Sequence, residues 1–144
     1  GRLVVEDKPH KSERFRTRLT VGGNLLHYEG TLGTPTAELT TIKLLLNHVI
    51  STPNAKFLTC DIQNFYLNPP MKDKEYFKLP VRIIPPDIMH HYKLDDLVHN
   101  DYVFVKVNKG MYGLPQAGIL AYTQLVTSLA PFGFHPVART PGLW

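Results

Sequence analysis

Cysteine and long apolar runs are scarce in this chain. A single cysteine, Cys60, occurs in 144 residues, which excludes an internal disulfide and a zinc site built on two or more cysteines. No uninterrupted apolar run approaches the roughly 20 residues that cross a bilayer, so we expect no transmembrane segment and no membrane partner. The opening stretch, residues 1–11, is charged and lacks the apolar centre of a secretory signal. These absences favour an intracellular, reducing setting.

The composition is that of a folded chain. Apolar residues make up 43%, and 16 basic against 12 acidic side chains leave a net charge of +4. Disordered chains bury less apolar surface and carry more unbalanced charge. The length fits one compact domain or part of a larger one, and the mild basic excess permits a polyanionic partner.

Alternation of apolar and polar residues predicts a strand over residues 15–21. The turn-forming residues 22–24 follow it and lead to a second apolar stretch at residues 25–26, so we expect a β-hairpin across this turn. Arg16 and Arg18 would share one face of the strand, because strand side chains alternate. The opposite, inner face would carry Phe15, Leu19 and Val21.

The remaining pattern predicts mixed helices and strands. Thr34 and Pro35 are typical of a helix start, with threonine as the N-cap and proline at the first helical position. The spacing of apolar residues then predicts a helix over residues 36–50. Further elements are a buried strand at 56–62, strands at 75–79 and 102–107, a helix at 87–92 inside a surface insertion (80–100), and a helix from Pro115 to Pro131. This order favours an α+β fold in which helices pack on an antiparallel sheet.

Asp61, at the end of the predicted buried strand, is the first candidate site residue. A carboxylate there is costly to bury unless a cation compensates it, and a divalent metal is one such cation. On spacing alone a helix cap or a salt bridge is the better explanation of a lone aspartate, because such residues more often cap helices than catalyse.

Two further segments could contact a ligand. The glycines of residues 110–118 lie at a strand-to-helix junction, where Gln116 could face a ligand, although a tight turn with a solvated glutamine is the simpler alternative. Arg16 and Arg18 could hold a triphosphate or a nucleic-acid backbone, or could be two solvated side chains of a hairpin. The group His90, His91, Asp95 and His99 has irregular spacing and no cysteine partner, so we expect no zinc site there.

Four ordered blocks, at residues 15–19, 39–46, 61–67 and 110–117, resemble the reverse transcriptase domain of copia-type retrotransposon polyproteins. The resemblance runs from Phe15 to Trp144. It implies the fingers and part of the palm of a right-hand polymerase, an RNA-directed DNA polymerase that adds deoxynucleotides to a primer 3′-OH.

The resemblance also implies roles for individual residues. Asp61 matches the first catalytic aspartate, which binds two Mg²⁺ ions (or Mn²⁺) with help from the Ile62 backbone carbonyl. Tyr66 matches the aromatic gate that leaves no room for a 2′-OH. Gln116 matches a glutamine that lines the nucleotide pocket, and Arg16 and Arg18 match basic residues that grip the triphosphate. The implied partners are an RNA or DNA template with its primer, deoxynucleoside triphosphates and the remainder of the polyprotein, in the cytoplasm within a retrotransposon particle or in the nucleus.

One family element does not occur in residues 1–144. The family carries two more catalytic aspartates in an aromatic-x-Asp-Asp hairpin after the second helix, so we expect these 144 residues alone to lack polymerase activity. Asp95 and Asp96 precede the Gln116 block and are assigned to a surface turn or helix cap. The alternative function is a non-catalytic or decayed nucleic-acid-binding fragment that keeps the core of the fold.

Overall fold

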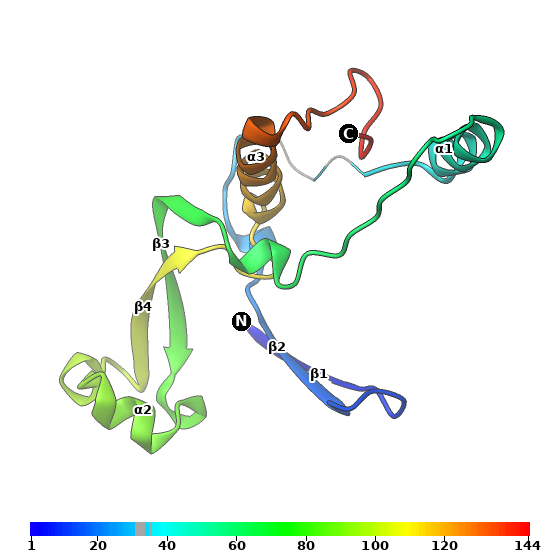
Figure 1. The fold of residues 1–144 in the computed structure, drawn as a ribbon. Helices are drawn as coiled ribbons and strands as arrows, with labels where there is room; N and C mark the ends of the chain where they lie inside the picture. The colour runs from blue at the N-terminus through cyan, green and yellow to red at the C-terminus, as the bar shows by residue number, and fades with distance from the viewer. Residues whose placement is uncertain (31–33, 35) are drawn as a thin grey trace.

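The described residues form an α+β structure of three helices and two small antiparallel sheets. The computed structural model describes residues 1–30, 34 and 36–144, with the backbone alone for residues 73 and 74. Strands β1 (Arg2–Asp7) and β2 (Phe15–Thr20) form one sheet, and β3 (Pro70–Pro80) and β4 (Tyr102–Lys109) form the other. The helices are α1 (Leu39–Ser51), α2 (Pro86–His91) and α3 (Ala117–Leu129). Instead of the single expected sheet there are two separate ribbons (Figure 1).

The N-terminal hairpin uses a different partner from the one predicted. Strand β2 pairs with the preceding segment, with Leu3 opposite Leu19 and Val5 opposite Thr17. The expected hairpin across residues 22–24 is therefore wrong: the chain enters a short 3-10 turn at Gly23–Leu25. Val4 and Val5 are residues typical of strands, and the register places them opposite Arg18 and Thr17 of β2.

Helix α1 begins three residues later than predicted. Glu38 is its N-cap and has an extended backbone (ψ 151°), and the Ile42 N–H donates to the Glu38 carbonyl at 3.2 Å. The predicted cap at Thr34 and Pro35 lies partly outside the described residues, because Pro35 is not among them. The helix contains no buried residue, and Leu39, Leu44 and Ile50 are exposed.

The predicted buried strand over residues 56–62 is wrong. This segment is a connection between α1 and the 3-10 turn Phe65–Leu67, and its residues are exposed, Phe57 and Leu58 among them (Figure 1). A strand needs a neighbour to bond its backbone N–H and C=O groups, and the strand pairings of the described residues do not include this segment. Composition alone could not reveal that the partner is missing.

The second ribbon confirms the predicted strands. Residues 75–79 lie in β3 and residues 102–107 lie in β4, with Phe77 opposite Val105 and Leu79 opposite Val103. Helix α2 lies within one residue of its predicted bounds, between the two strands, at the far end of the ribbon (Figure 1). The predicted helix after Pro115 is α3.

A small core joins this ribbon to the strand-to-helix junction. Phe77 and Val107, from the inner face of the ribbon, pack with Leu114 and Ala117. Leu19 and Val21 are packed against them and are partly buried, so the end of β2 contacts the same cluster. Phe15, predicted for the inner face, is exposed, because β1–β2 extends beyond the cluster.

None of the helices in the described ranges combines the length and the apolar composition needed to span a bilayer.

Candidate functional site

All three candidate segments contribute to one cavity, the glycine block through Tyr112. The cavity has a volume of about 920 Å³ and brings the β1–β2 hairpin next to residues 60–66. Arg16 and Arg18 line it from the hairpin side, which confirms their shared face, and Asp61 and Tyr66 line it from the other side. The remaining lining residues are Lys8, Lys11, Glu13, Cys60, Ile62, Gln63, Asn64, Phe65, Tyr112 and Leu125.

Glycines at the strand-to-helix junction bring these segments together. Gly113 has φ +91°, and a Cβ there would collide with the carbonyl oxygen of Val21. A Cβ on Gly110 would collide with the carbonyl oxygen of Tyr66. The Val21 N–H donates to the Tyr112 carbonyl at 2.8 Å, so the junction lies directly on the end of β2. These glycines permit the approach of another segment of the chain, whereas the sequence pattern predicted a ligand contact or a simple turn.

The hairpin side of the cavity is cationic. Four basic residues, Lys8, Lys11, Arg16 and Arg18, line it together with Glu13 of the same hairpin, and Asp61 on the other side is the second acidic lining residue, which leaves a positive excess. Such a set of amine and guanidinium groups suits phosphate oxygens.

Arg18 and Arg16 differ in how they are held. One Arg18 terminal nitrogen lies 3.4 Å from Glu6 Oε2, which also lies 3.4 Å from Lys8 Nζ. Neither contact has hydrogen-bond geometry, since Glu6 Oε2 and Arg18 Nε are buried atoms without a hydrogen-bond partner. Among the described side chains Arg16 makes no ion pair. Arg18 is thus fixed by neighbours, and Arg16 is available to an incoming anion.

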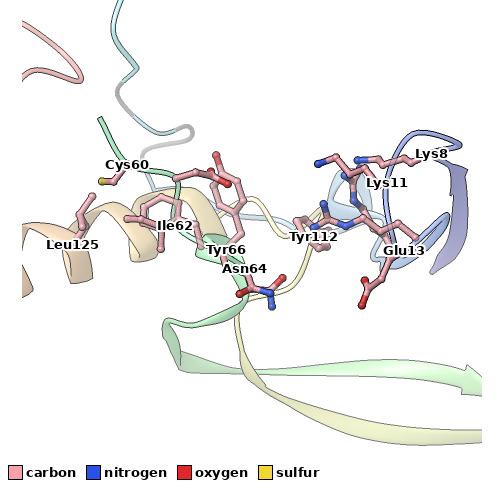
Figure 2. Close-up of a pocket in the computed structure, with 14 residues that line it drawn as sticks. Lys8, Lys11, Glu13, Cys60, Ile62, Asn64, Tyr66, Tyr112 and Leu125 are labelled. Atoms are coloured by element: carbon pink, nitrogen blue, oxygen red, sulfur yellow. The ribbon is translucent and has the colours of Figure 1, made fainter. Parts of the chain in front are cut away.

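Tyr112 links the two sides of the cavity. The Arg18 guanidinium lies 5.7 Å from the centre of the Tyr112 ring, within the range of a cation–π interaction. The Tyr112 ring lies 6.5 Å from that of Tyr66, at an interplanar angle of 64°. Figure 2 shows Tyr112 between Tyr66 and the hairpin side chains.

Asn64 turns the chain so that Tyr66 enters the cavity. Its φ of 54° is left-handed, a conformation that asparagine tolerates better than most residues. The Leu67 N–H donates to the Asn64 carbonyl at 2.8 Å and closes the turn. Phe65 packs edge-on against Tyr66, with ring centres 5.3 Å apart. Tyr66 is therefore held between two aromatic rings, those of Phe65 and Tyr112.

Asp61 offers the type of ligand that a magnesium site needs, but the described residues around it supply too few further ligands of that type. Its exposed carboxylate and the neighbouring Ile62 carbonyl are oxygen ligands of the type Mg²⁺ prefers. However, the described residues contain no group of three or more His, Cys, Asp or Glu side chains that could hold a metal.

Gln116 lies outside the cavity. It is buried, with 4% of its surface exposed, and its Nε2 donates to Glu75 Oε1 of β3 at 3.4 Å. Its Oε1 is buried without a hydrogen-bond partner. Gln116 thus links the start of α3 to the ribbon, and its role in a nucleotide pocket stays a prediction.

Several cavity residues, Lys8, Lys11 and Tyr112 among them, carry no sequence motif. Lys8 and Lys11 lie on the hairpin turn next to Pro9, and Tyr112 lies inside the glycine block. Lysines in a turn between two paired strands project past the end of the strands, so Lys8 and Lys11 would be candidates once the turn is known. The predicted turn, at residues 22–24, is not the one that the structure shows. Asp95 and Asp96 lie exposed in the first turn of the 3-10 helix Leu94–Leu97, as assigned from sequence. The histidines 90, 91 and 99 are exposed in that same region.

Arg14 stabilises the base of the hairpin turn. It donates two hydrogen bonds to the Asp7 carboxylate, at 2.9 and 3.0 Å. These bonds raise the pKa of the Arg14 guanidinium above its usual value, and slight desolvation opposes them. The guanidinium therefore stays charged at every working pH.

Comparisons with known proteins gave no match to a family model, a curated protein or a solved structure.

Proposed function

We propose that the chain is the fingers and N-terminal palm portion of a copia-type reverse transcriptase, and that its cavity holds the incoming deoxynucleoside triphosphate. One observation carries the proposal: Asp61 and Tyr66 line the same cavity as Arg16 and Arg18, although the two pairs come from distant segments. The motif pattern predicts that these four residues share one site. The two pairs are more than 40 residues apart in the sequence, so only the folding of the chain can bring them to one cavity.

The cavity offers a complementary surface for each part of such a ligand. The arginines and the turn lysines can neutralise the triphosphate, and electrostatic positioning supplies most of the catalysis in phosphoryl transfer. Tyr66 can pack against the sugar, where a rigid ring excludes an added 2′-hydroxyl by its shape. Asp61 is one carboxylate of a larger acidic set that the rest of the polymerase would supply.

Binding of a fluorescent deoxynucleoside triphosphate to the 144-residue chain tests the proposal. We expect the double variant Arg16→Ala, Arg18→Ala to bind at least about tenfold more weakly, because charge-assisted hydrogen bonds are lost. Arg82→Ala is the matched control, since Arg82 is exposed and lies outside the cavity. If both variants bind equally well, the cavity is not the triphosphate site.

The variant Lys8→Ala, Lys11→Ala provides a second test. It is needed because Arg18 also contacts Glu6, so the arginine variant could lose binding through damage to the hairpin. These two lysines lie beyond the end of the β1–β2 ladder. We expect weaker triphosphate binding and only a small shift of the unfolding curve, from the loss of the Lys8–Glu6 ion pair. Unaltered binding by this variant would remove the turn from the proposed site.

A longer chain that also carries the aromatic-x-Asp-Asp hairpin would test catalysis. We expect Asp61→Asn to abolish Mg²⁺-dependent primer extension and Asp96→Asn to retain it, because Asp96 is exposed and lies outside the cavity. Extension by the Asp61→Asn protein would exclude Asp61 as a catalytic residue. Triphosphate binding without any extension would favour the non-catalytic alternative.

A further inference from the structure

Strand β4 has one open edge. Its hydrogen-bonding partner is β3, and among the described residues no strand lies on its other side (Figure 1). Residues 102–107 of β4 are mostly valine and aromatic residues, which favour an extended backbone. An open edge of this kind offers unpaired N–H and C=O groups to another strand.

The pairing with β3 determines which backbone groups of β4 face the open edge. The Val81 N–H donates to the Asp101 carbonyl at 2.9 Å, so these two residues form a hydrogen-bonded pair. Hydrogen-bonded and non-hydrogen-bonded pairs alternate along antiparallel strands. The next pair, Tyr102 opposite Pro80, is therefore not hydrogen-bonded, as expected for a proline without an N–H. The Tyr102 backbone bonds to His99 instead, at 2.8 and 3.0 Å.

Phe104 and Lys106 repeat the orientation of Tyr102, because backbone direction alternates along a strand. Their N–H and C=O groups thus point away from β3, and no backbone hydrogen bond outside the β3–β4 ladder involves them in the described part of the chain. The side chains of both residues are exposed, Phe104 by 53%. Another strand can therefore pair here without disturbing β3.

Two copies of β4 are complementary in one antiparallel register. When Val105 lies opposite Val105 of a second copy, Phe104 lies opposite Lys106 of that copy, and Lys106 lies opposite its Phe104. This register joins the outward-pointing backbone groups of both copies as hydrogen-bonded pairs. It also sets an ammonium group beside an aromatic ring in each pair, a favourable cation–π arrangement.

The neighbouring registers that join outward-pointing groups are less favourable. One sets Lys106 opposite Lys106 of the second copy, and like charges directly opposed destabilise a sheet. The other sets Phe104 opposite Phe104 and Lys106 opposite Tyr102, whose backbone groups His99 already bonds. Charge and backbone bonding therefore select the register centred on Val105.

The selected register also continues the side-chain rows of the ribbon. Lys78 lies opposite Phe104 within one copy, with its Nζ 5.9 Å from the ring centre. In the joined sheet the Phe104 ring would lie between Lys78 and Lys106 of the second copy. Tyr76, 61% exposed and opposite Lys106, extends the same row on the far side of that lysine. Basic and aromatic side chains thus alternate across both copies.

We propose that β4 pairs with β4 of a second copy, antiparallel and centred on Val105, so that two ribbons form one continuous sheet. The second copy is the partner because the strand is complementary to itself in charge and in backbone bonding. None of the β4 residues lines the cavity, so the pairing does not depend on the proposed function. One pair of strands buries less than a standard interface of about 1,600 Å², and we expect a dissociation constant on the order of 10 μM.

Sedimentation of the whole chain over roughly 1–200 μM tests the pairing. We expect the wild type to change from monomer to dimer across this range. Phe104→Lys sets a like charge opposite Lys106 and should weaken association at least about tenfold, whereas Phe104→Glu sets an opposite charge there and should retain the dimer. The two variants are matched, since both replace the ring with a charged side chain and differ in its sign.

Two further variants separate pairing from folding. Lys106→Glu added to the Phe104→Lys protein again opposes unlike charges and should restore the dimer. Lys106→Pro removes an outward-pointing N–H, and proline is tolerated at such edge positions. That variant should be monomeric, with the circular dichroism spectrum of the wild type.

A disulfide cross-link tests the register directly. In the proposed dimer the two Val105 residues form a non-hydrogen-bonded pair, with Cα atoms about 4.5 Å apart, which is within the range for a disulfide. Val105→Cys should therefore give a covalent dimer on oxidation, in a Cys60→Ser background that removes the native exposed thiol. Tyr76→Cys in the same background is the control, because Tyr76 lies on β3, away from the paired edge.

Four outcomes would overturn the proposal. A wild type that is monomeric at every concentration would leave the edge to a different partner. Equal association of Phe104→Lys and Phe104→Glu would exclude this register, as would equal cross-linking by Val105→Cys and Tyr76→Cys. A dimer that persists in folded Lys106→Pro protein would place the contact on another surface. Triphosphate binding is measured separately, so failure here leaves the cavity proposal standing, and the reverse also holds.

Discussion

The Arg18 guanidinium lies over the ring of Tyr112, 5.7 Å from its centre, and this contact joins the N-terminal hairpin to the glycine block. On its other side the Tyr112 ring meets Tyr66. A side chain that no motif singled out therefore connects the cationic and the acidic segments of the cavity.

Tyr112→Ala should weaken triphosphate binding about three- to fivefold. The cation–π contact contributes roughly 0.5–1 kcal/mol at an exposed site, and its loss leaves Arg18 and Tyr66 less well positioned. Tyr112→Phe keeps the ring and should bind like the wild type. Titration with a fluorescent triphosphate measures both, and equal binding by the alanine variant would show that the ring does not organise the cavity.

Gly113→Ala should destabilise the fold by more than about 2 kcal/mol. The substitution combines a left-handed φ of +91° with a collision against the Val21 carbonyl. Gly133→Ala is the matched control, since Gly133 has φ +84° and open space where the Cβ would stand. Gly133→Ala should lower the free energy of unfolding by about 1 kcal/mol, because it carries only the conformational cost of a left-handed φ.

Urea unfolding followed by circular dichroism measures both glycine variants. If they are equally stable, the close approach of Gly113 to β2 contributes nothing.

Tyr66→Val should admit ribonucleoside triphosphates. The ring lines the cavity beside Asp61, and a smaller side chain leaves space for a 2′-hydroxyl. We expect the ratio of deoxy to ribo affinity to fall by about tenfold. Tyr66→Phe should preserve the ratio, because the ring remains. Competition binding with the two triphosphates gives the ratio, and an unchanged value for Tyr66→Val would exclude the gate.

Gln116→Met should change the free energy of unfolding by less than about 1.5 kcal/mol. The variant loses one long hydrogen bond to Glu75, but it also removes a buried carbonyl oxygen that has no partner. We expect triphosphate affinity to stay within twofold, because Gln116 lies outside the cavity. A tenfold weaker affinity at unchanged stability would instead support the nucleotide-pocket role that the resemblance implies.

The local elements with a strong sequence pattern could be predicted without the structure. Strands β3 and β4, helix α2, helix α3 and the shared face of Arg16 and Arg18 follow from alternation, helical spacing and proline positions. These patterns depend on neighbouring residues, so they survive without knowledge of the rest of the fold. The motif blocks likewise single out Asp61 and Tyr66, which line one cavity in the structure.

Which segments meet could not be predicted from local patterns and depends on the three-dimensional fold. The partner of β2, the exposed course of residues 56–62, the burial of Gln116 and the position of Tyr112 all depend on contacts between distant parts of the chain. A strand pattern specifies which residues alternate but not which strand supplies the hydrogen bonds, and a glycine permits close approach without naming the segment that approaches. The cavity exists because Gly110 and Gly113 let the junction lie against Tyr66 and Val21.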